Sequence, residues 1–304
     1  MSQPNASVAA DPVLAAQHRT DAQLAELRQK LVEGSLNPEA DAQLLADLVE
    51  NFSDPRGLTR MAIAEALAEV GKPASPYLIG ALAQHPNPVI RRACAKTLTL
   101  IADRTAIPTL IDALLNDPDT VVHGSAVGAL ARLGEDAVPE LIAILATPAT
   151  PETTKGHLAW ALAFIGAEAS EPIYREIGSD SAAVRAAVVG AVASIAESQP
   201  EDRAFRLLLD ALNDPAQNVR SEAAAALSKI EHKPAIPALL EMLDRPEGES
   251  RKAAALALMK LSGKEAIAPL SAALERESDD AVQKAIKLAI MQIERRLETE
   301  EEGW

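Results

Sequence analysis

The stretch VRSEAAAAL, residues 219–227, decides the fold, because seven other segments of the chain repeat its pattern. They are TRMAIAEAL from Thr59, IRRACAKTL from Ile90, VHGSAVGAL from Val122, TKGHLAWAL from Thr154, VRAAVVGAV from Val184, SRKAAALAL from Ser250 and VQKAIKLAI from Val282. The second residue of each copy marks the register, and successive markers stand 30 to 35 residues apart. A small residue follows every marker after six positions, and an aliphatic residue comes next. This regularity indicates a repeat protein.

A second motif stands about half a period after the first. Its copies are PYLIGAL from Pro76, PTLIDALL from Pro108, PELIAIL from Pro139, PALLEML from Pro237 and PLSAAL from Pro269. Proline suits the first turn of a helix, where its missing N–H has no partner to lose. Each repeat is therefore predicted to be two short helices joined by turns. The apolar residues are mostly Ala and Leu, which favour helix, and no alternating run of strand character occurs.

One helix pair cannot bury its apolar face alone, whereas stacked pairs can. We therefore expect an all-α, right-handed α-solenoid of about eight helix pairs, with a capping helix pair at its N-terminus. The expected segments are a disordered start (1–18), the capping helices (19–52), the repeats (53–297) and an acidic tail (298–304). We expect the tail to be a frayed, solvated helix end; its last residue, Trp304, is expected to be disordered, and docking of Trp304 is the alternative.

The composition narrows the function classes. A formal net charge of −15 argues against binding nucleic acid phosphates or an anionic membrane surface. The single cysteine, Cys94, allows no intrachain disulfide, which fits a reducing compartment. No signal peptide and no apolar run long enough to span a membrane is apparent. These features favour a cytoplasmic protein.

The motifs that carry chemistry are absent from the sequence. The five histidines form no zinc-binding pair, and neither a glycine-rich nucleotide loop nor a G-x-S-x-G elbow occurs. Cys94 occupies a repeat position that is aliphatic in the other copies, so we expect it to be a small buried side chain. We assign no catalytic residue and no metal ligand.

The combined pattern, VRxxAAxAL with AIPxLLxxL, resembles HEAT repeats of the phycobilisome-lyase type over roughly residues 52–297. The resemblance implies a cyanobacterial source and a protein partner in phycobiliprotein maturation or turnover, or in another cofactor-assembly pathway such as iron–sulfur delivery. The favoured function is a non-catalytic scaffold or chaperone without a cofactor. The alternative that the family implies is a bilin lyase subunit, which would bind a bilin, act on phycobiliprotein cysteines and work with a second HEAT-repeat chain.

The resemblance also implies a structural role for the recurring arginines. In HEAT-type repeats this arginine pairs with an aspartate of the preceding turn, and here Asp54 and Asp214 stand six residues before Arg60 and Arg220. We therefore expect a ladder across neighbouring repeats that satisfies turn backbone and fixes the stacking. Its expected arginines are Arg60, Arg91, Arg185, Arg220 and Arg251.

The resemblance places the second helix of each repeat on the inner face, with exposed positions one and five residues after the marker. Four of these positions are glycine, at a cost of about 1 kcal/mol each against alanine. A floor without side chains for an approaching partner explains them better than stability does. The predicted partner-binding residues are Gly124, Gly128, Gly156, Gly190, Trp160, Arg92 and Lys96. Trp160 is read as a binding anchor, or else as filling a gap in the stack. A lyase would use Trp160, Arg92 and Lys96 to hold a bilin.

Overall fold

The computed structural model describes residues 11–302, and all regular structure in that range is helical. The chain divides into two units, residues 1–133 and 134–304, each treated separately below. The chain is thus all-α and built from stacked helix pairs, as the repeats predict. The expectations for the first ten residues and for Trp304 fall outside the described residues.

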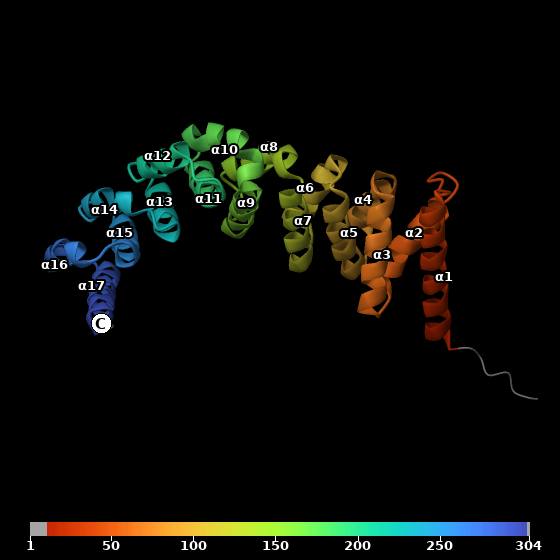
Figure 1. The fold of residues 1–304 in the computed structure, drawn as a ribbon. Helices are drawn as coiled ribbons and strands as arrows, with labels where there is room; N and C mark the ends of the chain where they lie inside the picture. Colours follow the sequence, from red (N-terminus) through yellow and green to blue (C-terminus); the bar gives the residue numbers. More distant parts are fainter. Residues whose placement is uncertain (1–10, 303–304) are drawn as a thin grey trace, which may run out of the picture. The chain divides into compact units, whose positions relative to one another are not determined.

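Unit 1 holds the N-terminal helix and three helix pairs (Figure 1). Its helices are α1 (Pro12–Glu33), α2 (Ala42–Glu50), α3 (Gly57–Val70), α4 (Ser75–Gln84), α5 (Pro88–Ile101), α6 (Ile107–Asn116) and α7 (Thr120–Arg132), with short 3₁₀ turns η1 (Asn51–Ser53), η2 (Lys72–Ala74) and η3 (Arg104–Ala106). The second helices α3, α5 and α7 pack side by side, and α1 packs against the free side of α3.

Unit 2 holds five helix pairs. Its first helices are α8 (Val138–Ala146), α10 (Ser170–Arg175), α12 (Asp202–Ala211), α14 (Ile236–Met242) and α16 (Ile267–Arg276). Its second helices are α9 (Glu152–Ile165), α11 (Ala182–Ser198), α13 (Gln217–Lys229), α15 (Gly248–Leu261) and α17 (Asp280–Glu302). The turns contain η4 (Gly134–Ala137), η5 (Gly166–Ala169), η6 (Glu176–Gly178), η7 (Lys233–Ala235) and η8 (Lys264–Ala266). Within this unit the second helices form the inner row of a curved stack (Figure 1).

The repeat register places the seams correctly. The small residues six positions after the markers are all buried, among them Ala161 and Ala191 of neighbouring helices in unit 2. A methyl group at the seam lets two helices approach closely. The positions one and five residues after the markers, by contrast, are exposed or half-buried in all eight copies.

The chain ends differ from the sequence-based boundaries. Helix α1 begins at Pro12, because Asp11 accepts a hydrogen bond from the Val13 amide at 2.9 Å and proline suits the first turn. The expected disorder is therefore wrong for residues 12–18. At the other end, residues 298–302 continue α17, in line with a helix end, so the boundary drawn at residue 298 does not separate two structures.

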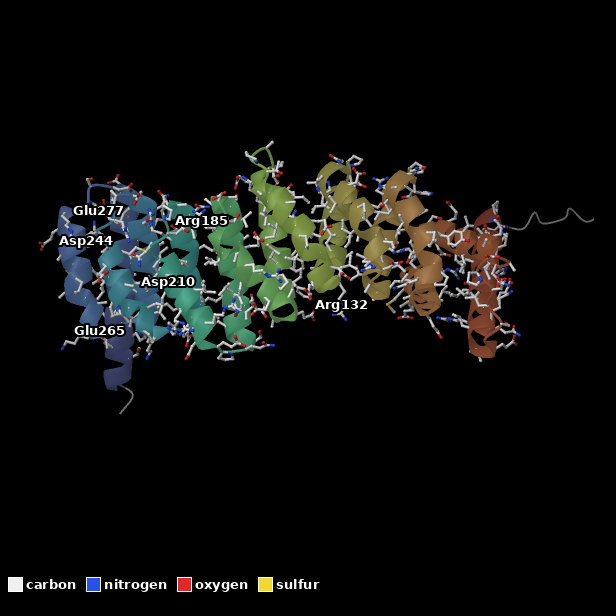
Figure 2. The ribbon with its side chains drawn as sticks, turned by 90° about the horizontal axis from the view of Figure 1, so that it is seen from above. Arg132, Arg185, Asp210, Asp244, Glu265 and Glu277 are labelled. Atoms are coloured by element: carbon white, nitrogen blue, oxygen red, sulfur yellow. The ribbon has the colours of Figure 1, made fainter. Side chains whose placement is uncertain are left out.

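The marker arginines join consecutive turns. Arg185 donates two hydrogen bonds to the Asp214 carboxylate, at 2.7 and 2.8 Å, and a third to the Ser179 carbonyl at 2.7 Å. Arg251 binds the Glu277 carboxylate in the same way, at 2.6 and 2.8 Å. Figure 2 shows Arg185 and Glu277 along the same edge of unit 2. Each such arginine therefore satisfies backbone of its own turn and links it to the next repeat.

The structure corrects the expected pairing of Arg60 and Arg220 with the aspartates six residues before them. Arg220 binds the Asp214 backbone carbonyl at 2.8 Å, and Arg60 binds the Asp54 carbonyl at 2.6 Å. The Asp214 carboxylate is bound by Arg185 of the repeat before. The pairing with the aspartate carboxylate of the same turn is therefore wrong, whereas the expected contacts with turn backbone are present in both arginines. Arg220 also reaches the next repeat, where its Nε donates to the Ser250 hydroxyl at 3.1 Å.

These pairs shift the carboxylate pKa values. Hydrogen bonds from Arg251 lower the pKa of Glu277 to about 2. Burial alone would raise the pKa of Asp214, but the bonds from Arg185 and the Ala216 amide outweigh burial, so this pKa is also lowered. Both carboxylates therefore stay ionised at neutral pH.

Candidate functional site

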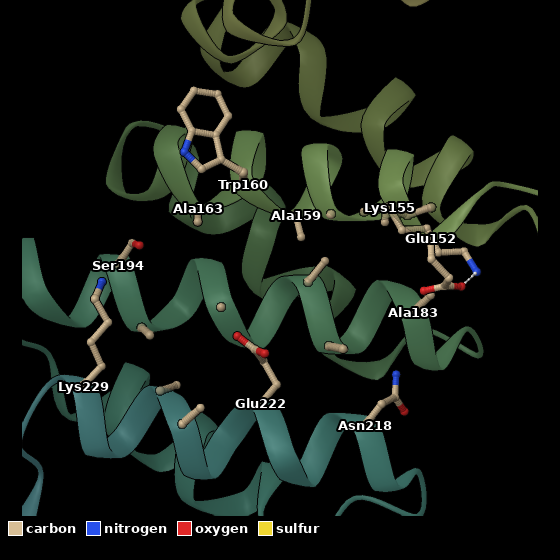
Figure 3. Close-up of a pocket in the computed structure, with 18 residues that line it drawn as sticks. Glu152, Lys155, Ala159, Trp160, Ala163, Ala183, Ser194, Asn218, Glu222 and Lys229 are labelled. Atoms are coloured by element: carbon tan, nitrogen blue, oxygen red, sulfur yellow. Dashed lines mark hydrogen bonds and ion pairs between the residues drawn. The ribbon is translucent and has the colours of Figure 1, made fainter. Parts of the chain in front are cut away.

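A groove of about 600 Å³ lies on the inner row of unit 2, along α11 and between α9 and α13 (Figure 3). Helix α11 provides its floor, and the two neighbouring helices provide its walls. Its lining residues are Leu145, Glu152, Lys155, Gly156, Ala159, Trp160, Ala163, Ala183, Ala186, Ala187, Gly190, Ala193, Ser194, Asn218, Glu222, Ala225, Ala226 and Lys229. Most of them are alanine or glycine, so helical backbone is close to the surface of the groove.

The glycines of the groove are not required by packing. A Cβ atom added at Gly156 would meet no atom within 4 Å. A Cβ at Gly190 would meet only the Glu222 side chain, whose Oε1 lies 3.2 Å away. Both glycines lie inside helices, without the positive φ that would demand glycine. The fold therefore does not explain their presence.

Two aromatic side chains stand exposed on α9, the helix that forms one wall. Trp160 is 51% exposed and Phe164 is 57% exposed. Their rings stack, with centroids 5.5 Å apart and planes inclined by 29°. Because half of its surface is in water, Trp160 does not fill a gap in the helix stack. An exposed aromatic pair of this kind is suited to contact another molecule.

The charges of the groove are paired except at one position. Lys155 binds Glu152 at 2.7 Å, and Lys229 binds Glu197 at 2.8 Å. For the Glu222 carboxylate, residues 11–302 provide no cation or hydrogen-bond donor within bonding distance. Water still reaches Glu222, yet the surrounding groove displaces part of its solvation, and this burial raises its pKa.

The seven predicted binding residues fall in different units. Gly156, Trp160 and Gly190 line the groove of unit 2. The other four belong to unit 1: Gly124 and Gly128 on α7, and Arg92 and Lys96 on α5. The two glycines of unit 1 also have open space around them. Arg92 forms an ion pair with Asp119, so its charge is already neutralised.

Glu222, which lines the groove, and Phe164, which stacks on Trp160, are absent from the predicted site. The sequence does single out Glu222, because it stands two residues after its marker, where six of the other seven copies hold alanine or serine. Phe164 stands four residues after Trp160, which is the spacing of neighbours on one helix face. The place of Glu222 inside a groove, by contrast, depends on the packing of α9, α11 and α13.

Three further properties bear on the chemistry. No cluster of three His, Cys, Asp or Glu side chains able to hold a metal ion occurs within the described part of the chain. The Cys94 thiol is buried, and burial raises its pKa. Among the helices from α1 to α17, none is long and apolar enough to cross a membrane.

Comparison with known proteins now gives the family. The model for HEAT repeats matches residues 75–163 and 205–291. The chain therefore belongs to the HEAT-repeat proteins. It is similar to the bilin biosynthesis protein MpeU of Synechococcus sp. (strain WH8020), with 36% identity over 203 residues, which is 67% of this chain and 68% of that protein.

Solved structures show weaker likeness. The phycocyanin lyase complex of CpcE and CpcF from Nostoc sp. PCC7120 matches with 21% identity and a TM-score of 0.32, covering 84% of this chain and 95% of that chain. Human deoxyhypusine hydroxylase matches with 19% identity and a TM-score of 0.35, covering 92% and 98%. At these TM-scores the likenesses carry no conclusion about this chain.

Proposed function

We propose that this chain is a non-catalytic HEAT-repeat scaffold that binds a protein partner in phycobiliprotein maturation or turnover. The observation that carries the proposal is the exposed Trp160–Phe164 pair beside a groove with a floor of small residues. Aromatic side chains often anchor interfaces, and a bare floor lets partner backbone come close. The similarity to a protein named for bilin biosynthesis supports a partner from phycobiliprotein maturation or turnover over one from another cofactor-assembly pathway.

A bilin lyase subunit is the second candidate, and the same relative favours it. A bilin has two propionates, which require cations. Lys155 and Lys229 at the groove are already bound to carboxylates, and the uncompensated charge of Glu222 would repel an anionic ligand. Arg92 of unit 1, expected to serve a bilin, is bound to Asp119. These charges favour the scaffold.

The test mixes the purified full chain with apo phycobiliprotein subunits and measures complex formation by size-exclusion chromatography and titration calorimetry. We expect a complex that Trp160→Ala weakens. Leu115→Ala is the matched control, because Leu115 is an exposed apolar side chain on α6, a first helix of unit 1. Absence of a complex with any subunit would refute the function.

Free bilin, added in a second titration, separates the two candidates. The scaffold predicts no change in the visible absorption of the bilin. A shifted band that Trp160→Ala abolishes would instead show bilin binding in the groove and favour the lyase candidate.

A further inference from the structure

The groove in unit 2 has the dimensions of a short helix. Its floor follows α11 from Ala183 to Ser194, which at 1.5 Å per residue is about 16 Å, or three helical turns. Packed helices lie about 8–10 Å apart, and the distance depends on the side chains between them. The glycine and alanine floor of α11 therefore allows a helix to approach closely, except over Gly190, where the Glu222 carboxylate lies.

The backbone of the groove offers no hydrogen bonds to an extended partner. Helices α9, α11 and α13 bond their backbone groups internally, and they present no strand edge. An extended segment placed here would leave its own N–H and C=O groups without backbone partners, whereas a helix satisfies them itself. Binding of an amphipathic helix in an apolar groove needs only side-chain contacts.

Glu222 adds a requirement of charge. In Figure 3 it lies in the middle of the groove, while the Lys155–Glu152 pair lies toward one end and Lys229 toward the other. A partner that covers the groove removes water from this carboxylate. Covering an unpaired carboxylate is costly, but a cation from the partner compensates the loss.

We propose that the groove receives one amphipathic α-helix of the partner protein, about three turns long, whose apolar face carries a lysine or arginine that pairs with Glu222. Trp160, which lines the groove toward the end that holds Lys229, contacts apolar residues of the partner there. The proposal rests on the proposed function, because that function supplies a protein partner.

The probe is a displayed library of helical peptides, about three turns long, with randomised residues on the apolar face. The library is selected on the full chain and on Glu222→Gln, Glu222→Lys and Glu275→Gln. Glu275 is the matched control, an exposed carboxylate on α16 in the outer row. We expect lysine or arginine at one enriched position on the wild type and Glu275→Gln, loss of that preference on Glu222→Gln, and an acidic residue on Glu222→Lys.

An enriched basic peptide, synthesised and titrated, measures the contribution of the charge. We expect its Kd to rise at least about tenfold on Glu222→Gln, as for the loss of one interfacial ion pair. The melting temperature of the variant should not fall, because the change removes an uncompensated charge. A selection without binders, a pool without a basic preference, or equal affinity for Glu222→Gln would overturn the proposal.

The two proposals fail in distinguishable ways. If basic helices are enriched but no phycobiliprotein subunit binds, the proposed function is wrong and the assignment of Glu222 stands. If a subunit binds through Trp160 and Glu222→Gln leaves its affinity unchanged, the function stands and the assignment of Glu222 is wrong.

Discussion

Replacing Gly156 by alanine should make the protein more stable. Gly156 lies inside α9, has no positive φ, and leaves a new Cβ with no atom within 4 Å. The gain is therefore the difference in helix propensity, about 1 kcal/mol. For a unit of this size that corresponds to a rise in melting temperature of roughly 2–4 °C.

Circular dichroism during thermal and urea unfolding measures this change. Gly134→Ala is the control with the opposite sign, because Gly134 has a φ of +61° and a side chain there is strained. Gly190→Ala should gain less than Gly156→Ala, because its Cβ would displace the Glu222 carboxylate. Unchanged or lower stability of Gly156→Ala would refute the view that this position is open helix surface.

The same variant tests why the glycine is there. If Gly156 serves close approach of a partner along the α9 wall, the added methyl group should weaken binding of the phycobiliprotein subunit while the protein becomes more stable. Such an opposition between stability and function is common at binding sites. Higher stability with undiminished binding would refute the functional interpretation of Gly156.

Trp160→Ala should lower the free energy of unfolding by only about 1–2 kcal/mol in urea titrations, because half of the side chain is already in water. Removal of a buried aromatic side chain costs roughly 3–5 kcal/mol, and a loss in that range would make Trp160 a core residue. Ala161→Leu should overpack a buried seam and cost about 1–3 kcal/mol or more, and an unchanged melting temperature would mean that the repeat register is wrong. Glu277 has a lowered pKa of about 2, so its contribution to stability is complete above its ordinary pKa of 4.5 and is lost as the pH falls toward 2. The stability difference between the wild type and Glu277→Gln should therefore shrink between pH 7 and about pH 3, and a pH-independent difference would contradict the ion pair with Arg251. Cys94 should react with a thiol reagent only as fast as the protein unfolds, and rapid labelling of the folded protein would contradict its burial.

The repeat pattern predicted those features that depend on neighbours along one helix. The buried seam at Ala161 and the exposed position of Trp160 both follow from the helical spacing relative to a marker residue. The start of α1 was missed because the residues after Asp11 lack the repeat pattern, although Asp-Pro is a helix-start signal.

The carboxylate partner of each arginine could not be read from local spacing. Asp214 stands six residues before Arg220 in sequence, yet its carboxylate binds Arg185, which is 29 residues away. Which turn a guanidinium reaches depends on the offset between stacked helices, and no single repeat contains that information.

The sequence by itself determined the helix pairs, their order and their seams, because periodicity and capping act within one repeat. Only the tertiary structure decided that α9, α11 and α13 enclose a groove. It also decided that Lys155 and Lys229 are neutralised there while Glu222 is not. The physical reason is that charge compensation and desolvation depend on side chains brought together from three repeats, and packing alone sets those distances.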